Sequence, residues 1–179
     1  MTLLALLADP LIRLLFTEKW LPVIVLLQWM SFARIVTPIS VVNMNILNAI
    51  GRSDLFLKVD LSKFPLIVLT LIITIPLGVK AMVIGHVITS GLSFFINAYL
   101  PGKLFGYGAL SQLKDMVPVL ISTVIMALLV LLITVFLDNL YLKLIFGSTV
   151  AIISYLGVCF LLRIQELDEV KSLLQKIRK

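Results

Sequence analysis

The stretch WLPVIVLLQWMSFARIVTPISVVNMNILNAIG, residues 20–51, decides the fold, because it is too apolar for a helix in water and too polar for one surrounded by lipid. At about 100° per residue, its polar side chains gather within an arc of about 120°. The residues on this arc are Ser31, Arg34, Thr37, Asn45 and Asn48. The remaining surface is mostly apolar, with Ser40 and Asn43 as exceptions. The pattern predicts a membrane helix with one face toward a polar cavity.

Arg34 lies deep in this predicted helix. It follows Leu21 by 13 residues, which is about 20 Å of helix in a hydrocarbon layer about 30 Å thick. A guanidinium at that depth must face protein or water rather than lipid. Pro38, one turn further on, predicts a kink.

The composition places the whole chain in the membrane class. Of its 179 residues, 61% are hydrophobic, against about 45–50% in soluble domains. The net charge of +6 comes from bases between apolar runs and at the C-terminus, a distribution typical of membrane orientation signals rather than of nucleic-acid binding. Cys159 is the single cysteine, which excludes a disulfide framework and a thiolate metal site. We expect an all-α, polytopic membrane protein.

The apolar runs predict five full transmembrane helices, a partial one at the N-terminus and an amphipathic one at the C-terminus. The partial helix is residues 2–16, broken near Pro10, and the full crossings are residues 20–51, 54–77, 80–100, 116–137 and 141–162. Pro101 and Gly102 are expected to end the crossing before residues 103–115, which are expected to be a loop. The domain division is then a transmembrane bundle, residues 1–163, and a cytoplasmic tail, residues 164–179, lying on an anionic membrane surface.

A second polar stripe lies on the predicted helix over residues 80–100. His86, Ser90, Ser93 and Asn97 fall within an arc of about 60°, so this stripe also faces either a cavity or a neighbouring helix. For His86, a hydrogen bond to a serine of another helix is favoured over a proton-relay role.

Two further patterns concern packing and depth. Small residues in the last crossing predict the close approach of another helix; they are Gly147, Ala151, Ser154 and Gly157. Lys58 and Lys63, at the charged start of the second crossing, are expected to extend to lipid headgroups.

The distribution of bases predicts the orientation. The links 51–63 and 101–115 and the tail carry ten Lys and Arg, namely Arg52, Lys58, Lys63, Lys103, Lys114, Arg163, Lys171, Lys176, Arg178 and Lys179. The alternate links carry Lys19, Lys80 and Lys143, with Arg13 as a fourth if residues 2–16 are helical. The positive-inside rule then places the C-terminus in the cytoplasm.

No pattern points to catalysis. His86 and Cys159 are on different predicted helices, and the sequence has no Gly-rich phosphate loop, HExxH or CxxC. The carboxylates, Asp60 among them, lie near the ends of apolar runs, where they are expected to be solvated. We therefore expect no enzyme, no metal and no cofactor.

Transport of an anionic compound is the sharper hypothesis for the first stripe. Arg34 offers a permanent charge and a fork of donors that fits phosphate oxygens, and Asn45 and Asn48 can bind sugar hydroxyls or neighbouring helices. Arg34 can equally be paired structurally, with a carboxylate or with carbonyls released near Pro38. Ser31, Thr37, His86, Ser90, Ser93 and Asn97 are expected to line the cavity or a helix-packing surface.

Three segments carry a family resemblance: LLADPLIRLLFTEKWLPVIVLLQ (residues 6–28), NILNAIGRSDLFLKVD (45–60) and PLGVKAMVIGHVITSGLSFFINAYLPGKLFGYG (76–108). They resemble the C-terminal part of lipopolysaccharide and exopolysaccharide flippases of the Wzx or colanic-acid exporter type, in the multidrug/oligosaccharidyl-lipid/polysaccharide exporter superfamily. PLIRLLFTEKW and NAIGRSD are the most specific parts, whereas the last two crossings match only in character.

The resemblance implies a partial MATE-like C-lobe of a bacterial inner-membrane protein with about fourteen helices in two lobes. Such a protein moves an undecaprenyl-diphosphate-linked oligosaccharide between leaflets by alternating access, in agreement with general transporter logic. The partners implied are membrane lipids, the lipid-linked oligosaccharide and a missing N-terminal lobe, and the chain alone is expected to be inactive. The alternatives are a cation-coupled drug exporter of the same fold and a non-transporting membrane scaffold subunit.

Overall fold

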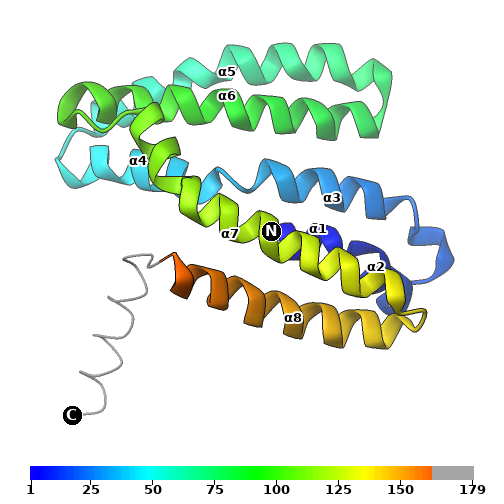
Figure 1. The fold of residues 1–179 in the computed structure, drawn as a ribbon. Coiled ribbons are helices and arrows are strands. Elements are labelled where there is room, and N and C mark those ends of the chain that lie inside the picture. Colours follow the sequence, from blue (N-terminus) through cyan, green and yellow to red (C-terminus); the bar gives the residue numbers. More distant parts are fainter. Residues whose placement is uncertain (163–179) are drawn as a thin grey trace.

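The computed structural model describes residues 1–162, and every regular element among them is a helix (Figure 1). The elements are α1 (Thr2–Leu6), α2 (Ala8–Leu15), η1 (Glu18–Trp20), α3 (Val23–Ala33), α4 (Thr37–Ala49), α5 (Ser53–Thr74), η2 (Ile75–Leu77), α6 (Val79–Phe105), α7 (Ala109–Phe136) and α8 (Leu140–Leu161). The all-α prediction is confirmed for this part of the chain. The predicted amphipathic tail, residues 164–179, lies outside the described residues.

Four segments are long and apolar enough to cross a membrane: α3 and α4 taken together as Val23–Ala49, then α6, α7 and α8. Their large apolar side chains are mostly exposed, as lipid-facing surfaces are. By length and composition this is a multi-pass membrane protein. The remaining expected crossing, residues 54–77, corresponds to α5, which is not among these four segments. The first half of α5 carries four charged residues, Asp54, Lys58, Asp60 and Lys63. A total of five crossings therefore stays a prediction.

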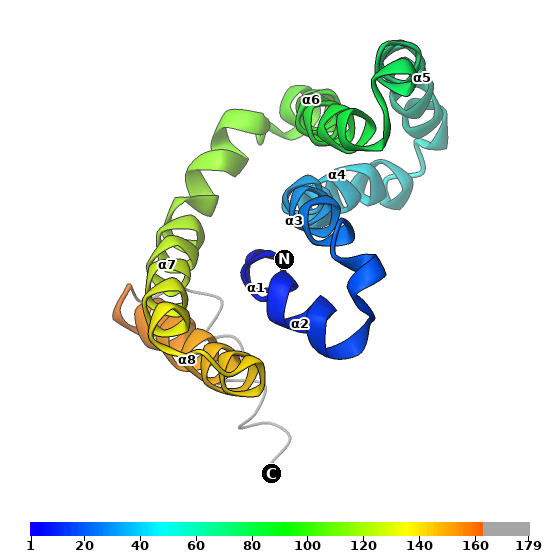
Figure 2. The same cartoon turned by 90° about the vertical axis from the view of Figure 1, so that its right-hand side faces the viewer.

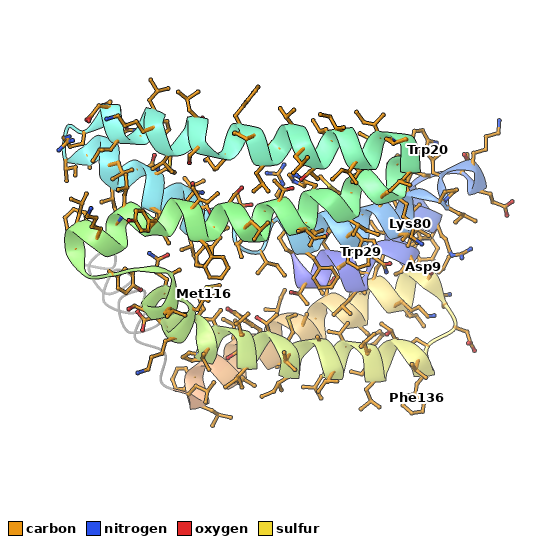
Figure 3. All side chains as sticks on the ribbon, turned by 90° about the horizontal axis from the view of Figure 1, so that it is seen from above. Asp9, Trp20, Trp29, Lys80, Met116 and Phe136 are labelled. Carbon is orange, nitrogen blue, oxygen red and sulfur yellow. The ribbon has the colours of Figure 1, made fainter. Side chains whose placement is uncertain are left out.

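The helices form two hairpins joined by an inner layer (Figure 2). α5 packs on α6, α7 packs on α8, α3 and α4 pack on α6, and α1 and α2 lie between α3 and the α7–α8 hairpin. Figure 3 places Trp20, Lys80 and Phe136 toward one end of the bundle and Met116 toward the other. The links between helices therefore alternate between two ends, as membrane crossings require.

The sequence pattern predicted one helix over residues 20–51. The structure instead has two helices there, separated at residues 34–36. Pro38 lies in the first turn of α4 and has no N–H to donate to the Arg34 carbonyl. That carbonyl accepts from the Thr37 N–H at 3.3 Å instead, and the Ile35 N–H donates to the Phe32 carbonyl at 3.2 Å. The predicted kink at Pro38 is therefore confirmed, in the stronger form of a break halfway along the crossing.

The N-terminal segment is a partial helix, as predicted, and it explains part of the small-residue pattern in α8. α1 and α2 meet at Leu7, three residues before Pro10. A Cβ added to Gly147 would lie 2.9 Å from Leu7 Cδ2, and Ala151 beside it is 1% exposed. The predicted close approach is confirmed at these two positions. Gly157 has open space around it, so the pattern does not extend that far.

The expected loop over residues 103–115 is wrong. α6 continues through Pro101 to Phe105, and α7 already begins at Ala109. The turn between them needs a left-handed residue, which is Gly106 with φ of 72°. A Cβ on Gly102 would lie 2.8 Å from the Gly108 Cα, so the turn is tight enough to require glycine there as well.

A buried pair of amides joins α4 to α7. Asn43 and Gln112 are 2% and 3% exposed and exchange two hydrogen bonds of 2.8 Å, each side-chain nitrogen donating to the other's oxygen. Gln112 Nε2 also donates to the Tyr107 carbonyl at 3.0 Å. Beside this pair, the Tyr107 hydroxyl donates to Asp115 Oδ2 at 2.6 Å, which raises the pKa of Tyr107. Asn43, an exception to the predicted polar arc, therefore serves helix packing.

We predict that Gln112→Leu destabilises the bundle by about 1–3 kcal/mol, because it leaves the buried Asn43 amide without a partner. The double variant with Asn43→Leu should lose less than the sum of the two single losses, since neither amide is then left unpaired. Reversible unfolding of the purified chain in detergent measures this. Asn48→Leu, an exposed amide of the same helix, is the control and should shift stability by no more than about 0.5 kcal/mol; additive losses would contradict the pairing.

Candidate functional site

A polar groove of about 390 Å³ opens between α4, α5 and α6. Its walls come from three consecutive helices, which are packed together because α4 and α5 both lie against α6. The lining residues are Val36, Thr37, Ser40, Val41, Met44 and Asn45 of the α4 side, Phe56, Asp60, Lys63 and Ile67 of α5, and His86, Thr89, Ser90, Ser93 and Asn97 of α6. Part of the first polar stripe, Thr37 and Asn45, meets the second stripe in this groove.

α5 and α6 are held close by small side chains along one side of the groove. A Cβ on Gly85 would lie 2.7 Å from Thr70 Cγ2 and 2.8 Å from Thr74 Cγ2. The hydroxyls of Thr70 and Thr89 are hydrogen-bonded at 2.9 Å. Because glycine and threonine allow the backbones to approach, the charged face of α5 and the polar face of α6 border the same space.

Six of the nine residues predicted for a binding or packing role line the groove. Thr37 and Asn45 come from α4, and His86, Ser90, Ser93 and Asn97 come from α6. Asn45 and His86 are exposed, and Ser90 and Ser93 are half-buried. The structure brings two residues of the first stripe to the second stripe, while the binding role of these residues stays a prediction.

Asn97 has the most unusual environment in the groove. The residue is 5% exposed, and its Oδ1 is the one buried side-chain nitrogen or oxygen without a hydrogen-bond partner in residues 1–162. Its backbone carbonyl cannot accept the usual helical bond either, because the residue four positions on is Pro101, which has no N–H. A buried acceptor left unpaired costs free energy, so this position favours a donor supplied from the groove.

An ion pair in the groove was missed by the sequence prediction. Lys63 Nζ lies 2.8 Å from Asp60 Oδ1, and the Lys63 side chain is only 12% exposed, against 58% for Asp60. The expectation that Lys63 extends to headgroups is wrong, because its stem follows the groove wall rather than the lipid-facing side of α5. Asp60, expected among solvated carboxylates at the end of an apolar run, lines the groove too. The helical spacing of Phe56, Asp60, Lys63 and Ile67 was the signal for this face.

Three of the predicted site residues lie away from the groove lining. Arg34 is exposed at the end of α3, and within residues 1–162 the structure gives its guanidinium no hydrogen bond or ion pair. Ser31 is buried, and its hydroxyl donates to the Leu27 carbonyl at 2.8 Å. Asn48 is exposed, and its Oδ1 accepts from the Ser53 hydroxyl at 3.4 Å. The structure therefore does not join Arg34 and Asn48 to Asn45 in one site.

His86 also differs from expectation. It is exposed in the groove, and the favoured hydrogen bond to a serine is not formed within the described part of the chain. The imidazole is therefore available to the groove rather than to helix packing.

The groove offers a definite set of interactions. Lys63 is a cation with three donors, one of which points to Asp60 Oδ1. Asn97 and Asp60 supply acceptors, and Asn45, Ser90 and Ser93 supply groups that both donate and accept. Such a lining suits a ligand with hydroxyls and a negative charge. Comparison of the chain with protein-family models, with curated proteins and with solved structures finds no match in any of the three.

We predict that the groove is hydrated at mid-membrane depth. In a Cys159→Ala background, Ser90→Cys should react with a water-soluble maleimide in proteoliposomes at least about tenfold faster than Ile153→Cys, because only a thiol in water ionises to the reactive thiolate. Ile153 is a matched control: it lies near the middle of α8 and is 66% exposed on its outer surface. Both cysteines should be labelled equally fast in denatured protein, which checks that the two thiols are equally reactive when exposed to water. Equally slow labelling of both cysteines in proteoliposomes would contradict a hydrated groove.

Proposed function

We propose that this chain is the C-terminal part of a flippase that moves an undecaprenyl-diphosphate-linked oligosaccharide across the bacterial inner membrane for lipopolysaccharide or exopolysaccharide synthesis. The observation that carries the proposal is the polar groove that begins where the α3–α4 crossing is broken. Val36 and Thr37, at that break, line the groove. Discontinuous helices beside a site near the bilayer midplane are typical of secondary transporters.

The depth of Lys63 supports a role in binding the diphosphate. It follows the first residue of α5 by ten positions, about 15 Å of helix, and so lies near the middle of α5. A buried ammonium needs an anionic partner, and Asp60 provides one in this state. A phosphate oxygen can take that place while the remaining donors of Lys63 bind further oxygens. We therefore transfer the diphosphate contact first assigned to Arg34 to Lys63.

The acceptors of the groove support the sugar side of the proposal. The unpaired Oδ1 of Asn97 requires a donor, and sugar hydroxyls are donors that also accept from Ser90, Ser93 and Asn45. A volume of about 390 Å³ is at the lower end of ligand pockets, about 300–1,000 Å³. The groove therefore accommodates one part of a lipid-linked oligosaccharide, and the N-terminal lobe implied by the family resemblance would supply the rest of the path.

We predict that Lys63→Gln weakens binding of undecaprenyl-diphosphate-linked sugar by about 10–100-fold. A hydrogen bond to a charged group contributes about 1.5–3 kcal/mol, and its loss lowers the affinity by about this factor. Binding to the purified chain in nanodiscs, with a fluorescent ligand, measures this. Lys63→Arg should retain most of the affinity, and Lys143→Gln, a lysine at the start of α8 outside the groove, should leave it unchanged. If Arg34→Ala lowers the affinity and Lys63→Gln does not, the diphosphate contact belongs to Arg34. If the unaltered chain binds the diphosphate-linked sugar lipid no more tightly than a monophosphate lipid, the proposal is refuted.

A cation-coupled drug exporter is the second candidate, and Asp60 is the observation that favours it. A carboxylate that is 58% exposed in a membrane groove can attract an organic cation. The two candidates predict opposite effects of Asp60→Asn. If the groove binds diphosphate, the variant frees Lys63 and keeps or strengthens lipid-diphosphate binding. If it binds organic cations, the same variant abolishes binding of ethidium, which isothermal titration of the nanodisc-embedded chain detects.

A further inference from the structure

The α5–α6 hairpin carries a second groove on a different face, and its chemistry is that of a lipid site. This groove has a volume of about 550 Å³. Apolar side chains such as Leu55, Phe95 and Leu100 form most of its lining, with Lys58, Ser62 and Tyr99 as the polar members. The residues are offset by about a third of a turn from those of the polar groove on both helices. It therefore lies on another face of the hairpin, separate from the proposed transport site.

Two polar members of this groove, Lys58 and Tyr99, lie toward the same end of the hairpin. Lys58 follows the start of α5 by five residues, and Tyr99 precedes the end of α6 by six, so both lie about 8–9 Å inside the ends of antiparallel helices. Both are exposed. A lysine and a tyrosine at this depth can place their polar atoms at the headgroup level while their apolar parts stay among acyl chains.

A third groove, of about 490 Å³, begins on the other side of the same aromatic residues. It shares Phe95 and Tyr99 with the second groove and is also lined by Gly102 and by Lys103. Phe95 and Tyr99 are 50% and 66% exposed, so they form a ridge with one groove on each side. Each groove carries one lysine, Lys58 or Lys103.

The charges of this surface are not neutralised by nearby carboxylates. Asp54 is paired with Arg52 at 2.9 Å, which holds the pKa of Asp54 down at about 2, and Asp60 is paired with Lys63. Asp115 accepts from the Tyr107 hydroxyl. Within residues 1–162 the structure gives neither Lys58 nor Lys103 an acidic partner. Two unpaired cations, one in each of two adjoining apolar grooves, match the charge of an anionic headgroup above two acyl chains.

We propose that this surface binds one anionic phospholipid, with its phosphate between Lys58 and Lys103 and its two acyl chains on either side of the Phe95–Tyr99 ridge. The Tyr99 hydroxyl donates to the headgroup. By the distribution of bases this end of the bundle faces the cytoplasm, so the lipid belongs to the inner leaflet. The site would set the depth of the α5–α6 hairpin whatever passes through the polar groove.

The test is competition between lipids for the full-length chain in mild detergent, read from the fluorescence anisotropy of labelled phosphatidylglycerol. Unlabelled phosphatidylglycerol should compete at least about tenfold better than phosphatidylcholine. Lys58→Gln and Lys103→Gln should each reduce this preference by about fivefold, as expected for one lysine at a membrane surface, and the double variant should remove it. The preference should also fall as salt is raised.

Matched variants separate this site from other basic regions. Lys143→Gln lies at the opposite end of the bundle and should leave the preference unchanged, and the bases of residues 163–179 are the same in every variant. Lys63→Gln tests the polar groove: if it alone removes the preference, the anionic lipid binds there and the surface proposal is wrong. Equal competition by both lipids in the unaltered chain, or a preference that survives the double lysine variant with unchanged helix content, would also overturn it.

Discussion

The missing N–H of Pro38 is the constraint on which the central part of the bundle depends. Because the Arg34 carbonyl cannot accept a bond from Pro38, the crossing changes to bonds between residues three apart over residues 34–37. Irregular backbone at membrane depth is tolerated only where it borders protein or water. Val36 and Thr37 meet this condition by facing the groove. The break that Pro38 causes therefore lies against the groove.

The same break explains which parts of the site were predictable from the sequence. A helical wheel assumes about 100° per residue throughout, but bonds between residues three apart advance by about 120°. Over three residues the difference is about 60°, enough to turn the polar arc of α3 away from that of α4. Thr37 and Asn45, after the break, line the groove as predicted, whereas Ser31 and Arg34, before it, do not. Asn48 also follows the break, but it lies near the end of α4, beyond the groove. Periodicity therefore indicates which face of an unbroken helix is polar, but not how far along the helix a site extends, and it fails across a break.

Other features were beyond the sequence because they depend on which helices become neighbours. Periodicity marked one face of α6 as polar, but it did not identify α4 and α5 as the helices that meet it. Lys63 could be predicted to lie in a membrane helix, yet whether its side chain extends to headgroups or into a groove depends on the position of α6. The sequence predicts that α6 ends at Pro101, whereas the helix continues through this proline to Phe105. The all-helical fold and the partial N-terminal helix needed no such knowledge.

Asn97 and Lys63 together limit what the groove can bind. An anion alone would satisfy Lys63 but would face the unpaired oxygen of Asn97, which accepts and does not donate. An organic cation would satisfy Asp60 and Asn97 but would be repelled by the ammonium of Lys63, which is 12% exposed in the same wall. A ligand that carries both a negative charge and hydroxyl donors satisfies all three residues at once. This combined requirement, rather than the charge of any one residue, is the physical reason for preferring a phosphorylated sugar over either a simple anion or a drug cation.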